Sequence, residues 1–93
     1  MRILIAEDDD STAGFVERGL SELGHAVSRV SEGNDALHAG AVEPFDVIVL
    51  DRMLPGIDGV EVLRRWRAAG INTPVILLTA LGGIADRVAG LEA

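Results

Sequence analysis

Four short apolar runs recur along the chain, and polar segments separate them. The runs cover residues 3–6, 26–30, 47–50 and 75–78. The first, third and fourth are continuous and rich in Ile, Val and Leu, which is typical of strands that are buried on both faces. The second run contains Ser28 and Arg29 and alternates between apolar and polar positions. This alternation predicts a strand at the edge of a sheet.

The segments between the runs have the spacing of helices. Asp10 or Ser11 is expected to cap the first helix, because short polar side chains accept hydrogen bonds from the free amides at a helix start. Val16, Leu20 and Leu23 share one face of this helix. Three further helices are expected, at residues 33–40, 59–69 and 84–92. In the third helix, the candidates for burial are Val60, Val62, Leu63 and Trp66.

The alternation of strands and helices predicts βαβ units and a parallel sheet with helices on both faces. Crossovers between parallel strands are right-handed, which leaves few topologies. We therefore expect an α/β fold with a doubly wound parallel sheet. If its strand order is 2-1-3-4, the first and third strands are neighbours. Residues 1–93 contain no linker or low-complexity tract, so we expect one domain.

Composition and charge exclude several classes of protein. The chain has 93 residues, of which 48% are hydrophobic, so it can bury one small core. It has eight arginines, no lysine and a net charge of -7, which argues against direct nucleic-acid binding. The absence of cysteine excludes disulfides and thiol catalysis. No apolar run reaches the roughly 18 residues of a membrane span. The acidic start does not resemble a signal peptide, so we expect a cytoplasmic protein with no membrane contact.

Acidic residues directly follow two of the predicted strands. Residues 7–10 are all acidic and follow the first run, and Asp51 follows the third. The carboxyl ends of parallel strands lie at one edge of a sheet, so in the order 2-1-3-4 these carboxylates converge. Two like charges about 4 Å apart repel by on the order of 4 kcal/mol at an effective dielectric constant of about 20. Such a cluster is tolerated only if it is protonated, extends into water or is neutralised by a cation. An all-oxygen ligand set suits Mg²⁺ best, with Mn²⁺ and Ca²⁺ as alternatives.

The acids at residues 7–10 also have a simpler interpretation. Acidic residues before a helix commonly form a solvated first turn that interacts favourably with the helix dipole. Asp9 and Asp10 fit that role. Asp51 is different, because capping does not require a second acid at the end of another buried strand. The combination of two acidic strand ends therefore favours a cation site.

Two further segments at the same edge carry candidate ligands. Pro55 and Gly56 form a tight turn in the loop after Asp51, and such a turn can direct a backbone carbonyl toward a metal. Thr79 follows the fourth run and precedes the small Ala80. A hydroxyl there can hydrogen-bond a phosphoryl oxygen while Ala80 leaves space for the group. A threonine at a strand end is also commonly structural.

These motifs follow one another in a set order. An acidic pair follows the first strand, Asp51 and the segment MLPGIDG at residues 53–59 follow the third, and Thr79-Ala80 follows the fourth. In this order the sequence strongly resembles the receiver domain of two-component response regulators. Residues 3–9 and 86–93 are most similar to the subfamily that carries a winged-helix DNA-binding domain. The resemblance covers the whole chain and implies a flavodoxin-like sheet with strand order 2-1-3-4.

The resemblance implies a role for each matching residue. Asp51 is the expected phosphoacceptor, which takes a phosphoryl group from the phosphohistidine of a sensor histidine kinase. Asp8 and Asp51 would bind Mg²⁺ directly. Met53 would bind it through its backbone carbonyl, and Glu7 through a water molecule.

The fourth strand end completes the site that the resemblance implies. Thr79, with Ala80 beside it, would bind the phosphoryl group and reorient when that group arrives. A carboxylate is a weak nucleophile, and the transferring group spreads its charge over three oxygens. Catalysis by such a site is therefore mainly positioning and charge neutralisation.

Members of the family continue beyond the point that corresponds to residue 93. They have a fifth strand, a lysine at its end that pairs with the phosphate, an aromatic switch residue and a fifth helix. This sequence stops before these features and contains no lysine. We therefore expect a receiver domain that is incomplete at its C-terminus, with the fifth strand and fifth helix absent. A buried-type strand left at an edge favours association, so we expect a dimer or a domain-exchanged oligomer.

The predicted function is a phosphoryl-accepting module that controls an output, expected to be a DNA-binding domain in the full-length protein. The alternative is a fragment that acts only as an interaction or dimerisation scaffold, without phosphorylation. We expect the chain to catalyse phosphoryl transfer to its own Asp51 and the later dephosphorylation, and not to act as an enzyme with turnover. An aspartyl-nucleophile phosphatase needs a second Asp two residues after the nucleophile, where this chain has Met53. Acids occupy the edge where a flavin-binding protein has its phosphate loop, which disfavours that class.

Overall fold

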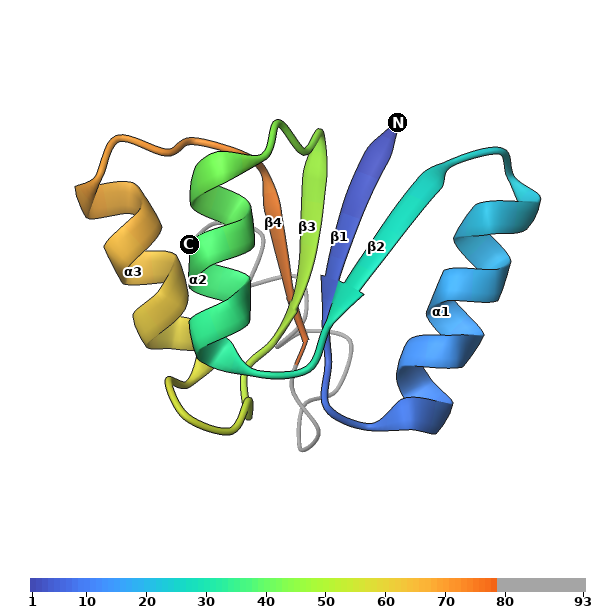
Figure 1. Ribbon diagram of the computed structural model, residues 1–93, viewed down its shortest axis with the longest axis horizontal. Coiled ribbons are helices and arrows are strands. Elements are labelled where there is room, and N and C mark those ends of the chain that lie inside the picture. Colours follow the sequence, from blue (N-terminus) through green and yellow to red (C-terminus); the bar gives the residue numbers. More distant parts are fainter. Residues whose placement is uncertain (79–93) are drawn as a thin grey trace.

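The four apolar runs form one parallel sheet, as their alternation with helical segments predicts (Figure 1). The computed structural model describes residues 1–78 of the chain. The strands lie in the order β2-β1-β3-β4, and every neighbouring pair is parallel. This arrangement confirms the expected doubly wound sheet with strand order 2-1-3-4. The strands are β1 (Arg2–Ala6), β2 (Ala26–Val30), β3 (Val47–Asp51) and β4 (Val75–Leu78).

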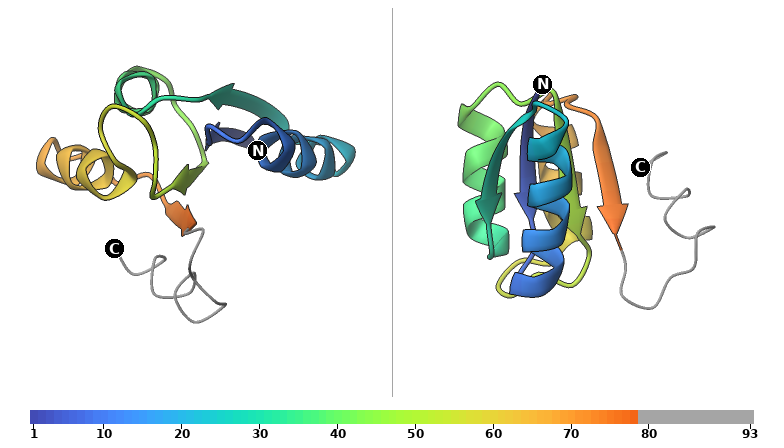
Figure 2. Two further views of the ribbon diagram at one scale, coloured as in Figure 1. Left: turned by 90° about the horizontal axis from the view of Figure 1, so that it is seen from below. Right: turned by 90° about the vertical axis from the view of Figure 1, so that its right-hand side faces the viewer.

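Helices cover both faces of this sheet. Figure 1 shows α2 and α3 side by side on one side of the strands and α1 on the other. The left view of Figure 2 looks onto the carboxyl edge and shows the strands between these two layers. The helices are α1 (Asp10–Glu22), α2 (Gly33–Val42) and α3 (Gly59–Ala68). Within residues 1–78, no helix has the length and apolar character needed to cross a membrane.

The larger part of the core lies between the sheet and the pair α2 and α3. Trp66 is 1% exposed, and its indole Nε1 donates a hydrogen bond to the Leu37 carbonyl at 3.1 Å. A Cβ atom at Gly40 would lie 2.4 Å from the Trp66 ring, so only glycine allows this approach of the two helices. The buried side chains of the strands here are Leu4, Ala6, Ile48, Leu50 and Val75.

A smaller apolar cluster lies on the opposite face, beneath α1. Ile3, Ile5 and Val49 are buried there, with Val16 and Leu20 of α1 packed against them. The expectation that Leu23 shares this face is wrong, because Leu23 is 73% exposed. The helix ends at Glu22, and Leu23 is already the capping residue at its C-terminus. Its side chain therefore does not continue the buried face of the helix.

The structure corrects the predicted start of α1. Asp9, and neither Asp10 nor Ser11, caps the helix. The Asp9 carboxylate oxygen Oδ2 accepts hydrogen bonds from the Thr12 amide at 2.8 Å and from the Thr12 hydroxyl at 2.6 Å. Asp10 is the first helical residue, and its carboxylate pairs with Arg29 at 2.9 Å. The capping residue is the one just before the helix, so Asp10, which is already helical, does not fill that position.

Two other helix predictions need adjustment. The second helix continues to Val42, two residues past the predicted end at Gly40. Gly40 does not end the helix, because it is buried against Trp66 and keeps a negative φ. In α3, Val62, Leu63 and Trp66 are buried as expected, whereas Val60 is only half-buried.

The strand predictions hold for three of the four runs. β1 and β3 are buried and central, and β2 lies at an edge as its alternation predicts. In β4 only Val75 is buried, and the next three residues are half-buried. Within the described sheet β4 has a single neighbour, β3, which explains its greater exposure. The predicted helix at 84–92, Thr79 and Ala80 lie outside the described residues. The extent of the domain and its association also stay predictions.

Candidate functional site

The residues that follow β1 and β3 meet at the carboxyl edge of the sheet. Ala6 pairs with Leu50 in the β1–β3 register, so Glu7 and Asp51 come next on adjacent strands. Carboxylate oxygens of Glu7, Asp8 and Asp51 all lie within 4.8 Å of one another. This cluster confirms the predicted convergence of carboxylates. It is also the point where the strand order reverses direction, which is where ligands bind in open α/β sheets.

Two of these three carboxylates are buried. Glu7 is 8% exposed and Asp51 is 7% exposed, whereas Asp8 is exposed. The Met53 amide donates a hydrogen bond to Asp51 Oδ1 at 3.2 Å, and the Asp9 amide donates to Glu7 Oε2 at 3.4 Å. Each buried carboxylate is therefore oriented by the backbone of the loop that follows it.

The close approach of these acids affects the ionisation of Glu7. The pKa of Glu7 is raised from 4.5 to about 7, first by burial of the carboxyl group and then by its hydrogen bond with Asp51 and the charge of Asp51. A proton on Glu7 relieves the repulsion between the two carboxylates. A metal cation would relieve the same repulsion with both groups ionised. The set of hard carboxylate oxygens fits a divalent cation such as Mg²⁺ or Ca²⁺.

The loop after β3 is packed too closely for side chains at some positions. A Cβ atom at Gly59 would lie 2.2 Å from the Asp51 carbonyl oxygen, and the Gly59 amide donates to the Arg52 carbonyl at 2.8 Å. Gly56 has a φ of 82°, as the predicted turn requires. Asp58 caps α3 through the Glu61 amide at 3.0 Å. These contacts fix the backbone of the loop that follows Asp51.

Met53 contributes to the site through its backbone. Its amide holds Asp51, while its side chain is 65% exposed. The predicted role of its carbonyl as a metal ligand stays a prediction. Of the other predicted residues, Glu7, Asp8 and Asp51 are brought together, and Thr79 and Ala80 lie beyond the part of the chain that the structure describes.

Sequence reasoning missed one residue of this edge, Arg29. The alternation of apolar and polar positions indicates only that Arg29 is a polar residue of an edge strand. In the structure its guanidinium donates to the Glu7 carbonyl from Nε at 3.2 Å and from Nη2 at 2.9 Å. The sequence does contain a signal for this contact. Arg29 is the last residue but one of β2, which lies beside β1 in the order 2-1-3-4, so its side chain is within reach of the acidic segment that follows β1.

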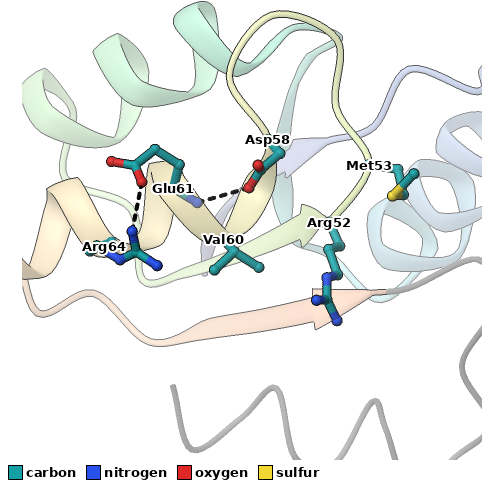
Figure 3. Close-up of a pocket in the computed structure, with 6 residues that line it drawn as sticks. All are labelled: Arg52, Met53, Asp58, Val60, Glu61 and Arg64. Atoms are coloured by element: carbon teal, nitrogen blue, oxygen red, sulfur yellow. Dashed lines mark hydrogen bonds and ion pairs between the residues drawn. The ribbon is translucent and has the colours of Figure 1, made fainter.

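A hollow lies between the loop after β3 and α3 (Figure 3). It encloses about 320 Å³ and includes none of the three clustered acids. Two of its charged side chains, Glu61 and Arg64, pair with each other at 2.9 Å. Its lining residues are Arg52, Met53, Asp58, Val60, Glu61 and Arg64.

Comparison with known proteins agrees with the fold and the acidic cluster. Residues 3–93 match the family described as the response regulator receiver domain. The chain therefore belongs to the response regulator receiver domain family. It is 46% identical over 92 residues to the transcriptional regulatory protein TcrA of Mycobacterium tuberculosis, covering 99% of this chain and 36% of that protein. It is 48% identical over 92 residues to the transcriptional activator protein IrlR of Burkholderia pseudomallei, covering 99% of this chain and 40% of that protein.

Solved structures show the same similarity. The receiver domain of the Francisella response regulator 1452 has a TM-score of 0.87 and 36% identity, covering 98% of this chain and 75% of that one. The receiver domain of the sensor histidine kinase PA1611 of Pseudomonas aeruginosa has a TM-score of 0.81 and 32% identity, covering 97% and 77%. That structure has a magnesium ion coordinated in its active site cleft. This chain spans two fifths or less of the length of TcrA and IrlR.

Proposed function

We propose that this chain is a phosphoryl-accepting module of two-component signalling and that Asp51 is the residue that is phosphorylated. The convergence of Glu7, Asp8 and Asp51 at the carboxyl edge is the observation that carries this proposal. Asp51 is buried, is anchored by the Met53 amide and lies at the centre of the edge. Membership of the receiver family supports the same assignment.

The proposed cation is Mg²⁺. Asp8 and Asp51 would hold it directly, Glu7 through a water molecule and Met53 through its backbone carbonyl. When bound, Mg²⁺ neutralises charge on the clustered carboxylates and on the phosphoryl oxygens. The donor set is entirely oxygen and includes two or more carboxylates, which suits this ion.

The chemical step is an in-line displacement at phosphorus. A carboxylate oxygen of Asp51 attacks the phosphorus atom of a phosphohistidine, the new P–O bond forms as the P–N bond breaks, and the imidazole leaves. The Met53 amide fixes Asp51 Oδ1 and so orients the nucleophile before the donor arrives. Each transfer leaves Asp51 as an aspartyl phosphate until it is hydrolysed. The module is therefore a self-modifying acceptor and no turnover enzyme.

The proposed partners follow from this chemistry. The phosphodonor is a sensor histidine kinase, so the chain would act in the cytoplasm. TcrA and IrlR are named as transcriptional regulators, which supports a DNA-binding output domain in the full-length protein. This chain has a net charge of -7 and is not itself the DNA-binding part.

Intact mass spectrometry after incubation with acetyl phosphate and Mg²⁺ tests the proposal. The parent chain should gain one phosphoryl group, and the Asp51→Asn variant should gain none. Asp46→Asn is the matched control, because Asp46 lies exposed near the opposite end of β3 and its substitution should leave the adduct intact. EDTA should prevent the reaction. A folded parent chain that gains no phosphoryl group would favour the alternative of an interaction scaffold without phosphorylation.

A further inference from the structure

The loop between β1 and α1, residues 7–9, carries two of the three clustered acids. One side chain from a neighbouring strand contacts Glu7, at the start of this loop, and Asp10, the first residue of α1. Arg29 donates from Nε and Nη2 to the Glu7 carbonyl at 3.2 and 2.9 Å. The third nitrogen, Nη1, lies 2.9 Å from Asp10 Oδ1. All three nitrogens of one guanidinium are therefore engaged across the loop that contains Asp8.

The position of Arg29 in the sheet explains these contacts. Arg29 pairs with Ile5 in the β1–β2 register, and the Glu7 amide donates to the Val30 carbonyl at 3.0 Å. Strand β2 ends at Val30. The guanidinium therefore supplies a donor to the Glu7 carbonyl where the regular pairing of β2 with β1 ends. Both backbone polar groups of Glu7 are held from β2, one by main chain and one by side chain.

Arginine is suited to this role because its planar guanidinium presents several donors in a fixed geometry. The Arg29 side chain is 26% exposed, and its hydrogen bonds to the Glu7 carbonyl are partly shielded from solvent, whereas the Asp10 side chain is 91% exposed. A lysine at this position would keep the charge, but its single ammonium would not span the Glu7 carbonyl and the Asp10 carboxylate in the same way.

We infer that Arg29 is a positioning residue for the cation site formed by Glu7, Asp8 and Asp51. This inference rests on the proposed function. By fixing the backbone of Glu7 and the first residue of α1, Arg29 holds Asp8 beside the two buried carboxylates before a cation binds. Arg29 itself does not ligate the cation.

The sign of one effect separates positioning from simple electrostatics. A positive guanidinium close to the cluster repels a cation, so charge alone predicts that removal of Arg29 strengthens Mg²⁺ binding. Positioning predicts the opposite, because an unrestrained loop must be ordered when the cation binds. A purely structural role lowers the free energy of unfolding without changing the Mg²⁺ affinity of the folded protein.

The first measurement is calorimetric titration of Mg²⁺ into the parent chain and into Arg29→Gln, Arg29→Lys and Arg2→Gln. Substitution of a residue that supports a metal ligand commonly lowers affinity by 10-fold or more, so Arg29→Gln should bind about 10-fold more weakly. Arg29→Lys should lie between this variant and the parent. Arg2→Gln is the matched control, because Arg2 lies at the other end of β1, pairs with Glu43 and carries the same charge. Unchanged or stronger binding by Arg29→Gln would overturn the inference.

The second measurement needs no metal and separates this inference from the proposed function. Amide hydrogen exchange in EDTA should become faster at Glu7 and Asp9 in Arg29→Gln, because their amides donate to the Val30 carbonyl and to Glu7 Oε2, while exchange at Ile5 in the centre of β1 stays as in the parent. Unchanged exchange at Glu7 and Asp9 overturns the inference whatever the titrations show. A parent chain that binds no Mg²⁺ defeats the proposed function, and the exchange experiment still decides whether Arg29 positions the loop. If Arg29→Gln does not fold, Arg29→Lys decides both measurements.

Discussion

At the amino edge of the sheet, the two acidic side chains Glu43 and Asp46 are exposed, and each has a basic or amide partner. Glu43 pairs with Arg2 at 3.2 Å, with both side chains nearly half exposed, and Asp46 accepts a hydrogen bond from the Arg2 amide at 2.7 Å. At the carboxyl edge, Glu7 and Asp51 are buried and face each other. The first arrangement satisfies each charge locally. The second leaves repulsion that a proton or a cation must relieve.

This difference separates a structural edge from a functional one. Charges that serve only the fold are expected to lie in solvent with opposite charges beside them. Buried like charges reduce stability, and ionisable groups with shifted pKa values are concentrated at functional sites. The repulsion between Glu7 and Asp51 at the carboxyl edge therefore lowers the free energy of unfolding, and we expect bound Mg²⁺ to raise it again. The following predictions test this contrast, beginning with the largest effect.

Mg²⁺ should stabilise the parent chain strongly. A ligand at 100 times its dissociation constant raises the free energy of unfolding by about 2.7 kcal/mol when only the folded state binds it. Urea unfolding with and without EDTA measures this difference. Asp51→Asn should show almost no response to Mg²⁺, and in EDTA it should be more stable than the parent because one of two facing carboxylates is gone. Equal Mg²⁺ stabilisation of both proteins would contradict the site.

Gly59→Ala should disturb the carboxyl edge directly. Its Cβ atom would lie 2.2 Å from the Asp51 carbonyl oxygen and 2.9 Å from the Arg52 Cα, so the backbone that positions Asp51 must move. We expect a loss of about 1–3 kcal/mol in the free energy of unfolding and weaker Mg²⁺ binding. Gly19→Ala is the matched control, because Gly19 lies inside α1 with nothing within 4 Å of the new Cβ. It should stabilise the protein by roughly 0.5–1 kcal/mol.

Stability in EDTA should depend on pH through Glu7. The pKa of Glu7 is about 7 in the folded protein, against 4.5 for an ordinary glutamate. The folded state therefore binds more protons between these two pH values, and the contribution of Glu7 to stability is lost as the pH rises from 4.5 to about 7. Urea unfolding across this range should show the effect as a difference between the parent and Glu7→Gln. A constant difference would contradict it.

The same group predicts a pH effect on the cation. A proton on Glu7 competes with Mg²⁺, so the affinity should increase as the pH rises through about 7. Calorimetric titration at several pH values measures this, and in Glu7→Gln the increase should be smaller.

Substitutions at the amino edge should have the smallest effects. Arg2→Gln removes an exposed ion pair with Glu43 and a cation–π contact in which the Arg2 guanidinium lies 5.2 Å from the Phe45 ring centre. Exposed ion pairs contribute about 0–1 kcal/mol, so urea unfolding should show a loss within that range. Mg²⁺ affinity should not change. A change as large as that of Arg29→Gln would mean that net charge, and not position, governs the carboxyl edge.

Much of the fold and site can be predicted from local patterns. Continuous apolar runs identify central strands because side chains on both faces are buried, and this interpretation holds for β1 and β3. It is less accurate for β4, because burial at the edge of a sheet depends on what covers the strand. The closeness of Glu7 and Asp51 could be predicted for the strand order 2-1-3-4, because parallel strands end at one edge and this order places β1 next to β3.

Other features depend on distances that no local pattern contains. Leu23 fits the apolar face of α1 by spacing, but the helix ends one residue earlier. Asp9 caps that helix because it is the last residue with extended backbone before the helix and its carboxylate reaches the Thr12 amide, whereas Asp10 is already helical. Gly40 resembles a helix end in the sequence, whereas in the structure it is the point at which α2 approaches Trp66.

Local patterns are sufficient to predict the parallel α/β sheet and the acidic residues that follow β1 and β3, because periodicity and strand-end position are properties of short segments. How these acids are held depends on the assembled fold. The role of Arg29 at the Glu7 carbonyl and the closeness of Gly59 to Asp51 depend on contacts between segments more than 7 residues apart. Such contacts form only when the sheet has assembled, and they set the burial and ionisation on which the site depends.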